Sequence, residues 1–572
     1  MKLKGAQILC ECLVKEGVEV IFGFPGGSVI PLYDVLPQYP QLRHILVRHE
    51  QCAAHAADAY ARVTGKVGVC IATSGPGASN LVTGIANAHL DSSPILAITG
   101  QVARPFIGKD AFQEIDITGI TVPITKHNRI VRKAEDIAIR VREAFHIAST
   151  GRPGPVLLDF PRDVFLEEAV FHYPDKVDLP GYKPTLKGHP AQIKRAARLI
   201  QESKRPVILA GRGINISQAH KELLELAEKT DIPVITTLLG ISSFPENHEL
   251  SMGMLGMHGM AYANMAVNNA DLVIAIGMRF DDRATGKVSG FAPHAQIVHI
   301  DIDPSEIGKN VRVTVPIVGE VKNVLRVLNK EVMELKHPEW IAQMHLWKRE
   351  HPADITSNGT FIKPQSVIDK ICEITKSNAI IVTGVGQHQM WAAQHYCYIK
   401  PNSLVSSGGL GTMGFALPAA VGSKVGLPNE IVWAIDGDGS FQMTLQELAT
   451  VVQEKLDIKI AIMNNTFLGM VRQWQELFHN RNYVATPITG PDFVKLAEAY
   501  GIPAARVMEK TKVAEAIETA MKHKGPYILE FIVEPEENVY PMVAPGATLA
   551  QVLEDPRKKI KVKETSKEIS NL

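Results

Sequence analysis

Two apolar runs that each end in a polar turn constrain the fold of this chain more than any other feature. Residues 431–435 (IVWAI) and 458–463 read as buried strands. The segment between them, opened by Thr444 and Glu447 as a capping box, reads as a helix to about Lys455. Strand, helix, strand is a crossover that places two parallel strands side by side. The carboxyl ends of both strands then face the crevice where α/β sheets bind ligands.

The turns at these two strand ends carry the residue types of a site for a metal ion and a diphosphate. Residues 436–440 (DGDGS) follow the first strand, and Asn464 and Asn465 follow the second. Asp438 and Asn465 supply carboxylate and amide oxygens, which suit Mg²⁺, an ion that completes its coordination with water and substrate phosphates. The glycines allow backbone N–H groups to approach those phosphates. Gly, Asp and Asn also form ordinary turns, but the paired strand ends favour a binding site.

Composition limits the classes of protein that this chain can belong to. Its 572 residues are too many for one core, so about three to four domains are expected. Lys and Arg number 60, as do Asp and Glu, and the formal net charge of zero indicates neither a nucleic-acid nor a membrane partner. No apolar run reaches the ~18 residues of a membrane span, and the amino terminus reads as an amphipathic helix. The six cysteines lack disulfide or metal spacing, so a reduced, cytoplasmic setting is expected.

Alternation of apolar runs with helical patterns predicts an α/β protein with three doubly wound parallel-sheet domains. A glycine-rich turn at 211–216 (GRGINI) lacks the third glycine of the dinucleotide fingerprint, so the pattern alone allows a middle domain with no ligand. The predicted domains span 1–165, 190–330 and 365–550, with a Pro-rich linker at about 167–190, a polar linker at about 330–365 and a charged tail at 555–572.

The paired turns resemble the thiamin-diphosphate motif, in which GDG is followed by NN after a helix and a strand. By this resemblance the side chains of Asp438 and Asn465 and the backbone oxygen of Phe467 hold Mg²⁺. Gly439 and Ser440 lie against the diphosphate. The resemblance therefore makes the third domain the diphosphate-binding domain.

Glu50 follows a short predicted strand and begins a predicted helix. Read by itself, it is a glutamate that interacts favourably with the helix dipole. The segment 48–62 (RHEQCAAHAADAYAR), however, resembles the family's pyrimidine-binding motif. The resemblance implies that Glu50 bonds the thiamin pyrimidine and promotes the imino tautomer that deprotonates the thiazolium carbon. The first domain is then the pyrimidine-binding domain.

Other segments are similar to one branch of these enzymes, the acetohydroxyacid (acetolactate) synthases and their large catalytic subunits. Residues 111–114 (AFQE), 125–128 (TKHN), 468–475 (LGMVRQWQ) and 536–543 (EENVYPMV) carry this similarity. Without the resemblance, Phe112 and Trp474 are ordinary core residues and Arg283 is a surface arginine. The resemblance instead assigns a catalytic or substrate-lining role to Gln113, Arg162, Arg283, Met470 and Trp474, with Trp474 shaping the pocket for the second 2-oxo acid.

The resemblance also implies that the middle domain binds FAD, without net redox chemistry. Residues 255–259 (LGMHG), 277–283 (GMRFDDR) and 299–303 (HIDID) look like the FAD-contacting segments of that branch. The residues assigned to FAD are Arg152, Gly211, Arg212, Gly213, Thr237, Leu238, Leu255, Met257, His258, Gly277, Arg279, Asp281, Asp301 and Glu320.

Further assignments in the third domain follow from the same resemblance. Gln387 and His388 bind the diphosphate, and Gly411 lies in a segment (408–414, GGLGTMG) whose Met413 props thiamin in its bent form. Read alone, a histidine is more often structural, and a methionine often fills gaps in a core. The chain departs from the family at three positions, with Arg162 for the usual Lys, Glu320 for Asp and Gly384 for Asp.

The resemblance as a whole implies a synthase of the acetohydroxyacid type. Pyruvate loses carbon dioxide with thiamin diphosphate as electron sink, and the remaining two-carbon unit is joined to a second 2-oxo acid. Pyruvate as acceptor gives 2-acetolactate and 2-oxobutanoate gives 2-aceto-2-hydroxybutanoate, both precursors of valine, leucine and isoleucine. Sites in this family form between the first domain of one subunit and the third of another, so a homo-oligomer is implied. A separate small regulatory subunit is also expected.

Three alternatives stay open at this stage. One is a catabolic acetolactate synthase that does not use FAD. Another is an oxidoreductase of the pyruvate oxidase type. The third is a non-catalytic protein with the thiamin-binding fold, against which the joint presence of Glu50, Asp438 and Asn465 argues.

Overall fold

Short apolar runs in the first third of the chain form a six-stranded parallel sheet in the order β3-β2-β4-β5-β7-β6. The computed structural model describes residues 2–353 and 359–557. The strands are β2 (Val20–Gly23), β3 (Arg43–Leu46), β4 (Gly68–Ala72), β5 (Ile95–Gln101), β6 (His127–Ile130) and β7 (Val156–Pro161). The connecting helices are α1 (Gly5–Lys15), α2 (Ile30–Val35), α3 (Glu50–Thr64), α4 (Pro76–Asn80), α5 (Val82–Leu90), α6 (Ile117–Thr121), α7 (Ile137–Ser149) and α8 (Arg162–Leu166).

The middle of the chain forms a second parallel sheet, in the order β11-β10-β9-β12-β13-β14. Counted within the unit this order is 3-2-1-4-5-6, the order of dinucleotide-binding folds. The strands are β9 (Pro206–Ala210), β10 (Val234–Thr236), β11 (Ser251–Met254), β12 (Leu272–Ile276), β13 (Gln296–Asp301) and β14 (Val315–Val318). The helices are α9 (Pro190–Glu202), α10 (Arg212–Ser217), α11 (His220–Thr230), α12 (Ala261–Asn269), α13 (Asp282–Thr285), α14 (Val321–Glu331) and α15 (Pro338–Glu350).

The third sheet has the order β16-β15-β17-β18-β20-β19, which within the unit is the same 2-1-3-4-6-5 order as in the first. Its strands are β15 (Ala379–Thr383), β16 (Leu404–Ser406), β17 (Ile431–Gly437), β18 (Ile458–Asn464), β19 (Ala504–Val507) and β20 (Tyr527–Ile532). Its helices are α16 (Pro364–Thr375), α17 (Gln387–His395), α18 (Ala416–Gly426), α19 (Asp438–Phe441), α20 (Leu448–Gln453), α21 (Gly469–Phe478), α22 (Phe493–Ala499) and α23 (Val513–Lys522). The predicted fold class, three doubly wound α/β units, is therefore confirmed.

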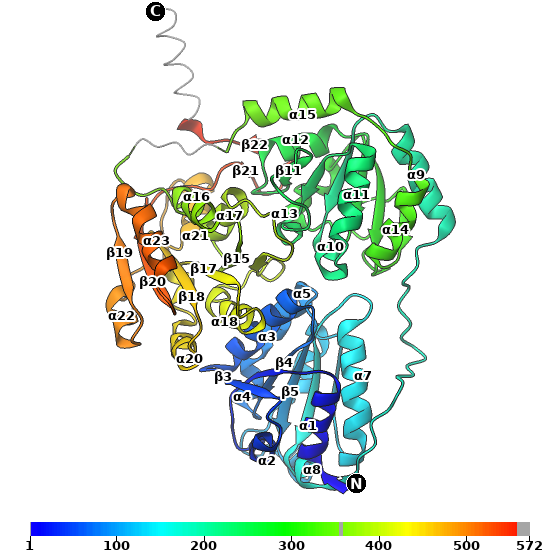
Figure 1. Ribbon diagram of the computed structural model, residues 1–572, viewed down its shortest axis with the longest axis vertical. Helices are drawn as coiled ribbons and strands as arrows, with labels where there is room; N and C mark the ends of the chain where they lie inside the picture. The colour runs from blue at the N-terminus through cyan, green and yellow to red at the C-terminus, as the bar shows by residue number, and fades with distance from the viewer. Residues whose placement is uncertain (1, 354–358, 558–572) are drawn as a thin grey trace, which may run out of the picture.

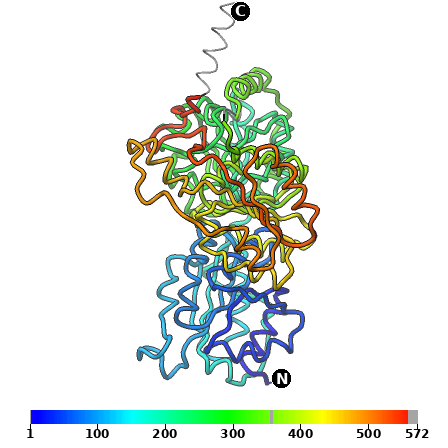
Figure 2. Tube along the Cα trace, turned by 90° about the vertical axis from the view of Figure 1, so that its left-hand side faces the viewer, coloured from blue at the N-terminus to red at the C-terminus, as the bar shows by residue number. Residues whose placement is uncertain are grey.

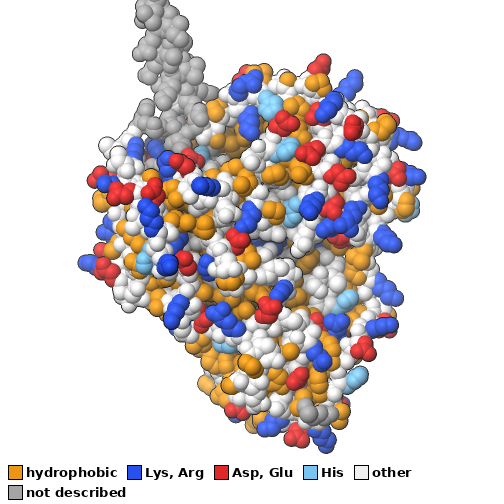
Figure 3. Space-filling view, viewed as in Figure 1, with side chains coloured by type: hydrophobic (Ala, Val, Ile, Leu, Met, Phe, Trp, Pro, Cys, Tyr) orange, Lys and Arg blue, Asp and Glu red, His pale blue; other side chains and the backbone are white. Residues whose placement is uncertain are grey.

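The first unit lies at one end of the molecule, and the other two lie side by side at the other end (Figures 1 and 2). Helices α3 and α18 pack against each other and join the first and third units. Small residues allow this close approach, because a Cβ atom at Gly422 of α18 would lie 2.0 Å from the backbone oxygen of Ala56 in α3. Charges of both signs are interspersed over the surface seen in Figure 3, as the balanced composition leads one to expect.

Two segments predicted as linkers contain regular structure. Within 167–190, β8 (Glu168–Val170) pairs antiparallel with β1 (Lys2–Lys4) and ties the start of the chain to the start of this connection. Within 330–365, α15 buries Trp340 against the middle unit, because its apolar residues face one side. Near the carboxyl terminus, β21 (Met542–Val543) pairs with β22 (Val552–Leu553). Of the predicted tail, residues 558–572 lie outside the described part of the chain.

The capping box predicted at Thr444 and Glu447 is wrong. Thr444 makes no cap, and the segment runs as a short 3₁₀ turn (Leu445–Glu447) into α20, which ends at Gln453. The Thr444 hydroxyl instead donates to the backbone oxygen of Gly414 at 2.8 Å, and Glu447 accepts from the backbone N–H of Arg48 at 2.8 Å. These tertiary contacts, one within the third unit and one to the first unit, outweigh the local capping preference. No helix among the described residues is long and apolar enough to cross a membrane.

Candidate functional site

A cavity of about 950 Å³ lies where the three units meet. The first unit contributes the ends of α5 and α7, which lie at the amino edge of its sheet, and the loop after α7. The second and third units contribute the loops at the carboxyl ends of their strands, where α/β sheets bind ligands. The residues assigned to FAD that line it are Arg152, Arg212, Gly213, Thr237, Leu238, Leu255, Met257, His258, Gly277, Arg279, Asp281, Asp301 and Glu320.

Glycines at the start of α10 let two backbone segments approach each other at the wall of this cavity. Gly211 is the residue before α10, and a Cβ atom there would lie 2.2 Å from the backbone oxygen of Gly277. Gly213 is also close, with a Cβ position 2.6 Å from the Gly277 Cα, and Gly277 has a φ of 61°. Gly211 itself is not among the lining residues. These contacts leave the amino end of α10 open toward the cavity.

Two half-buried side chains at the cavity have buried polar atoms without a hydrogen-bond partner in the part of the chain that the structure describes. Arg212 donates to the Ser93 hydroxyl at 2.9 Å, while its Nε has no partner in the described part of the chain. Burial, together with the positive charge of Arg62, lowers the pKa of Arg212 to about 10. The Nδ1 atom of His258 is also without a partner, and burial lowers the pKa of its ring to about 4. Buried groups of this kind are normally paired, so both point to a polar ligand in the cavity.

Acidic and basic side chains also contact one another at the wall of the large cavity. Arg152 reaches Glu306 at 2.8 Å and Asp303 at 3.2 Å. Asp301, at the end of β13, accepts a hydrogen bond from the Asp303 N–H at 2.9 Å, and burial raises its pKa to about 6. Glu320, one of the three positions at which the chain departs from the expected pattern, caps α14 by accepting a hydrogen bond from the Asn323 N–H at 3.0 Å.

A smaller cavity of about 70 Å³ adjoins the first. It lies at the carboxyl ends of β15, β17 and β18, as predicted from the strand pattern. The two cavities share Val385, Gly386, Met413, Met470 and Val471, so they are continuous. The residues predicted to bind diphosphate or metal that line the smaller cavity are Gln387, His388, Asp438, Gly439, Ser440, Asn465 and Phe467.

Oxygen atoms suited to a metal ion come together in this smaller cavity. Asp438 is buried at the start of α19, and burial raises its pKa to about 7 although backbone N–H groups, including that of Asn465, partly offset the effect. The Asn465 side-chain oxygen accepts from the Phe467 N–H at 3.0 Å, and its nitrogen donates to Gln387 at 3.4 Å. Within the described residues no group of three or more His, Cys, Asp and Glu side chains could hold a metal. The donor set is thus one carboxylate supplemented by amide and backbone oxygens.

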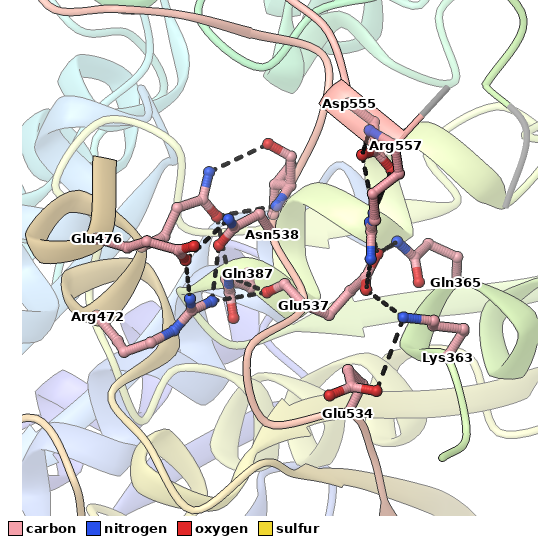
Figure 4. A network of polar contacts seen from close by, with 12 residues as sticks. Lys363, Gln365, Gln387, Arg472, Glu476, Glu534, Glu537, Asn538, Asp555 and Arg557 are labelled. Carbon is pink, nitrogen blue, oxygen red and sulfur yellow. Dashed lines mark hydrogen bonds and ion pairs between the residues drawn. The ribbon is translucent and has the colours of Figure 1, made fainter. Parts of the chain in front are cut away.

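A buried polar network behind the smaller cavity holds Gln387 in place (Figure 4). The Gln387 side-chain nitrogen donates to the backbone oxygen of Glu537 at 2.8 Å and to Gln473 at 2.9 Å. Arg472, fully buried on α21, donates to the same Glu537 oxygen at 2.8 Å and to Asn538 at 2.7 Å. Sequence reasoning assigned no role to Arg472, Gln473 or Glu537. The only available signal was their place inside the segments 468–475 and 536–543.

The opposite face of α21 borders the large cavity. Met470 and Trp474 lie one turn apart and both line it, and the Trp474 ring meets the Phe478 ring edge-on with centroids 5.8 Å apart. Arg283 lines the same cavity from α13, with its guanidinium exposed and 3.1 Å from Asp282. Gly411 lines it as well. The structure therefore brings these four predicted residues together.

Glu50 and Gln113 lie elsewhere, at the carboxyl edge of the first sheet. Glu50 is buried at the start of α3 and accepts a hydrogen bond from Asn80 at 2.9 Å. Gln113 has a φ of 59° and packs against Gly75, where a Cβ atom would lie 2.8 Å from the Gln113 Cβ. Neighbouring Phe112 is 88% exposed, so it is not a core residue of this chain.

None of Glu50, Gln113 and Arg162 lines either cavity described here. Arg162 begins α8 and is exposed. Strands such as β5 (7 residues) separate this carboxyl edge from the amino edge that borders the large cavity. At about 3.3 Å per residue, that separation is on the order of 20 Å. Within one chain, the two groups of predicted residues are therefore apart.

Each of the three units matches a known protein family. Residues 3–120 match the family described as thiamine pyrophosphate enzyme, N-terminal TPP binding domain. Residues 193–328 match the central domain of these enzymes, and residues 384–531 match their C-terminal TPP binding domain.

Whole-chain relatives carry one activity in their names. An acetolactate synthase of Mycobacterium bovis is 51% identical over 96% of this chain and 91% of the relative. A probable acetolactate synthase large subunit of Methanocaldococcus jannaschii is 50% identical over 98% of this chain and 97% of the relative. An acetolactate synthase large subunit of Porphyra purpurea is 50% identical over 96% and 95%. The chain therefore belongs to the thiamine pyrophosphate enzymes, within the family of acetolactate synthase large subunits.

Proposed function

We propose that this chain is the catalytic subunit of an acetolactate synthase that acts with thiamin diphosphate, Mg²⁺ and FAD. It would decarboxylate pyruvate and join the remaining two-carbon unit to a second 2-oxo acid, giving 2-acetolactate or 2-aceto-2-hydroxybutanoate. The observation that carries this proposal is the meeting of Gln387, His388, Asp438 and Asn465 at the carboxyl ends of three neighbouring strands. Thiamin diphosphate, when bound, supplies the electron sink for decarboxylation.

The smaller cavity suits Mg²⁺ and a diphosphate. Asp438, the side-chain oxygen of Asn465 and the backbone oxygen of Phe467 would hold the ion, which prefers oxygen ligands and keeps positions for phosphate. A carboxylate buried without a cation is costly, as the raised pKa of Asp438 indicates, and a bound divalent ion would remove that cost. Gly439 and Ser440 lie in the first turn of α19 and line the same cavity, so the N–H groups of this turn would bind the phosphates.

The large cavity suits FAD. Its volume is at the upper end of the ~300–1,000 Å³ range of small-molecule sites, and the strand order of the middle sheet is that of dinucleotide-binding folds. Arg212 and His258 offer donors that lack a partner, and a flavin dinucleotide carries phosphate and ring acceptors for them. We therefore assign the 190–330 domain to FAD, beside a pyrimidine-binding domain at 1–165 and a diphosphate-binding domain at 365–550.

The second substrate would enter the large cavity beside α21. Met470 and Trp474 offer apolar surface there, which suits the alkyl group of a 2-oxo acid. Arg283, with an exposed guanidinium at the same cavity, would bind the carboxylate of that acid. Met413 lines both this space and the smaller cavity, and Gly411 lines the large cavity near it. The thiamin rings would lie beside Met413.

Two copies of the chain would be needed for one complete site. Glu50, Gln113 and Arg162 lie at the edge of the first unit that is remote from the cavities of their own chain, so they would complete the site of a second copy. In that position Glu50 would exchange a proton with the thiamin pyrimidine. We further propose a cytoplasmic homodimer or higher oligomer with a separate small regulatory subunit. The last point rests on relatives that are named large subunits.

The proposal is tested by incubating the purified chain with pyruvate, thiamin diphosphate, Mg²⁺ and FAD, and by measuring 2-acetolactate as acetoin after acid treatment. The expected result is acetolactate formation that is lost when thiamin diphosphate is omitted. Full activity without FAD would favour a catabolic synthase, and pyruvate-dependent consumption of dioxygen would favour an oxidase. A folded protein that binds thiamin diphosphate but forms no acetolactate would overturn the proposed reaction.

A further inference from the structure

Asp436 is a fully buried carboxylate near the end of β17, next to Gly437 and Asp438, which line the proposed diphosphate site. Its Oδ1 atom lies 3.3 Å from His388 Nε2 and accepts a hydrogen bond from the Gly437 N–H at 3.0 Å. Its Oδ2 atom has no hydrogen-bond partner in the part of the chain that the structure describes, and the same holds for His388 Nε2. The Asp436 carboxylate and the His388 imidazole are thus buried next to each other, and each has a polar atom without a hydrogen-bond partner among the described residues.

Three glycines make room for this pair. A Cβ atom at Gly384 would lie 1.9 Å from Asp436 Oδ1. A Cβ atom at Gly386 would lie 3.0 Å from the His388 ring, and one at Gly437 would lie 3.0 Å from His388 Nδ1. The spaces that side chains at these positions would fill are occupied by Asp436 and His388 instead.

The sheet register explains why Gly384 and Asp436 compete for one space. Strands β15 and β17 are parallel neighbours, with Thr383 opposite Ile435, so Gly384 and Asp436 are the next pair along. The Gly384 N–H also donates to the Ile435 oxygen at 3.1 Å, which holds the two strand ends together. Side chains at paired positions of adjacent strands point to the same face of a sheet. A carboxylate can therefore reach this place from either strand, but not from both.

We propose that Asp436 is a positioning residue that orients His388 toward the diphosphate, and that Gly384 is required because it leaves space for this carboxylate. The inference rests on the proposed role of His388 in binding thiamin diphosphate. It also accounts for the glycine at position 384, where the resemblance in sequence leads one to expect an aspartate: the acidic group stands on the neighbouring strand. Asp436 touches neither metal nor substrate in this arrangement and acts only through His388.

The test is calorimetric titration of thiamin diphosphate, in the presence of Mg²⁺, into the full-length protein freed of cofactor. Asp436→Asn and His388→Ala are each expected to raise the Kd about tenfold or more, as the loss of a group that orients a ligand commonly does. The double variant Asp436→Asn/His388→Ala should bind no more weakly than His388→Ala alone. Glu246→Gln, which removes a half-buried carboxylate outside both cavities, should keep the parent Kd.

A relocated carboxylate gives a second, independent test. Gly384→Asp alone should abolish binding, because its Cβ collides with Asp436. Gly384→Asp/Asp436→Ser moves the acid to the neighbouring strand and should restore most of the affinity that Asp436→Ser loses. This pair of variants decides the question if Asp436→Asn fails to fold, as judged by near-ultraviolet circular dichroism.

The outcomes separate this inference from the proposed function. Parent-like affinity in Asp436→Asn together with weak binding in His388→Ala would overturn the positioning role and leave the diphosphate site intact. Additive losses in the double variant, or no recovery in the relocated variant, would overturn it as well. Parent-like affinity in His388→Ala would instead remove His388 from the proposed site, and the inference with it.

Discussion

Gln387 donates a hydrogen bond to the backbone oxygen of Glu537, 150 positions later in the chain, at 2.8 Å. This contact ties a proposed diphosphate ligand to the carboxyl-terminal segment. The Glu537 side chain is itself held by Lys363, Gln365 and Arg557 (Figure 4). The position of Gln387 therefore depends on a buried ion pair at the edge of the third unit.

Removing that ion pair should destabilise the third unit. Glu537→Gln leaves the ammonium of Lys363, only 6% exposed, with only the more distant carboxylate of Glu534 at 3.9 Å, and we expect the free energy of unfolding to fall by about 3 kcal/mol. The apparent Tm, followed by circular dichroism, should fall by several degrees. The matched control is Glu515→Gln, which breaks an exposed pair with Lys512 and should leave the Tm unchanged. Equal Tm values for the two variants would contradict the role given to Glu537.

The same pair predicts a pH dependence of stability. Burial raises the pKa of Glu537, but hydrogen bonds from Arg557 and Lys363 outweigh burial and hold the pKa below its ordinary value of 4.5. A carboxyl group whose pKa is lowered by folding stabilises the protein above the unfolded value, and this stabilisation is lost as the pH falls through the folded value. As the pH falls from about 5 to about 3, the Tm of the parent should therefore fall more than that of Glu537→Gln. Parallel curves would exclude Glu537 as the source.

Arg212 is expected to control flavin binding. Arg212→Ala removes the donor that lacks a partner at the large cavity, and the affinity for FAD should fall about tenfold or more, the usual value of a hydrogen bond to a charged group. Flavin absorbance retained after gel filtration measures the change. Arg326→Ala, which alters a largely exposed arginine paired with Glu222, serves as the control and should retain flavin like the parent. Full flavin retention in Arg212→Ala would place FAD elsewhere.

Trp474 is expected to set the choice of the second 2-oxo acid. Trp474→Leu enlarges the large cavity beside α21, and the preference for 2-oxobutanoate over pyruvate should change about tenfold. The ratio of the two products formed in a mixture of both acids measures it. Trp347→Leu, at a half-buried tryptophan outside the cavity, should keep the parent ratio. An unchanged ratio in Trp474→Leu would remove this residue from the acceptor pocket.

Mixing two inactive variants tests whether one site draws on two copies of the chain. Glu50→Gln should lose about 100-fold or more in turnover, the usual contribution of a proton-transferring group, and Asp438→Asn should lose its metal site. If each site combines Glu50 of one copy with Asp438 of another, a mixed dimer has one intact site. After unfolding and refolding together in equal amounts, about a quarter of the parent activity should return. No recovery in a mixture that has demonstrably exchanged subunits would show that each chain completes its own site.

Sequence pattern predicted the central strands well and the sheet edges poorly, for a physical reason. A strand such as β17 is buried along most of its length and reads as an unbroken apolar run, so the residues predicted as a strand, 431–435, lie within the observed strand Ile431–Gly437. The edge strands β6 (HNRI) and β19 (AARV) meet solvent and carry charged residues, so no such run marks them. These two strands form because they pair with β7 and β20, and the local sequence pattern holds no information about that pairing.

The residues of the candidate site were likewise only partly predictable from the sequence. Turns after strands, such as the one containing Asp438, are visible because parallel strands bring their carboxyl ends to one edge. The sequence pattern did not indicate a role for Arg472 or Gln473, because their importance comes from contacts with residues 537–539, more than 60 positions away. The capping prediction at Thr444 was wrong for a related reason. Its hydroxyl could have capped a helix but instead donates to the backbone oxygen of Gly414. The assignments of individual residues to cofactors stay predictions.

The contact between Gln387 and Glu537 also bears on how the protein is made. A ribosome adds roughly 5–20 residues per second, so the partner of Gln387 is synthesised roughly 8–30 s after Gln387 itself. The first unit, which β8 completes at Val170, has its full sequence long before then. The sequence of the first unit is thus complete before the residue that supports Gln387 has been synthesised, so the proposed diphosphate site is completed only near the end of synthesis.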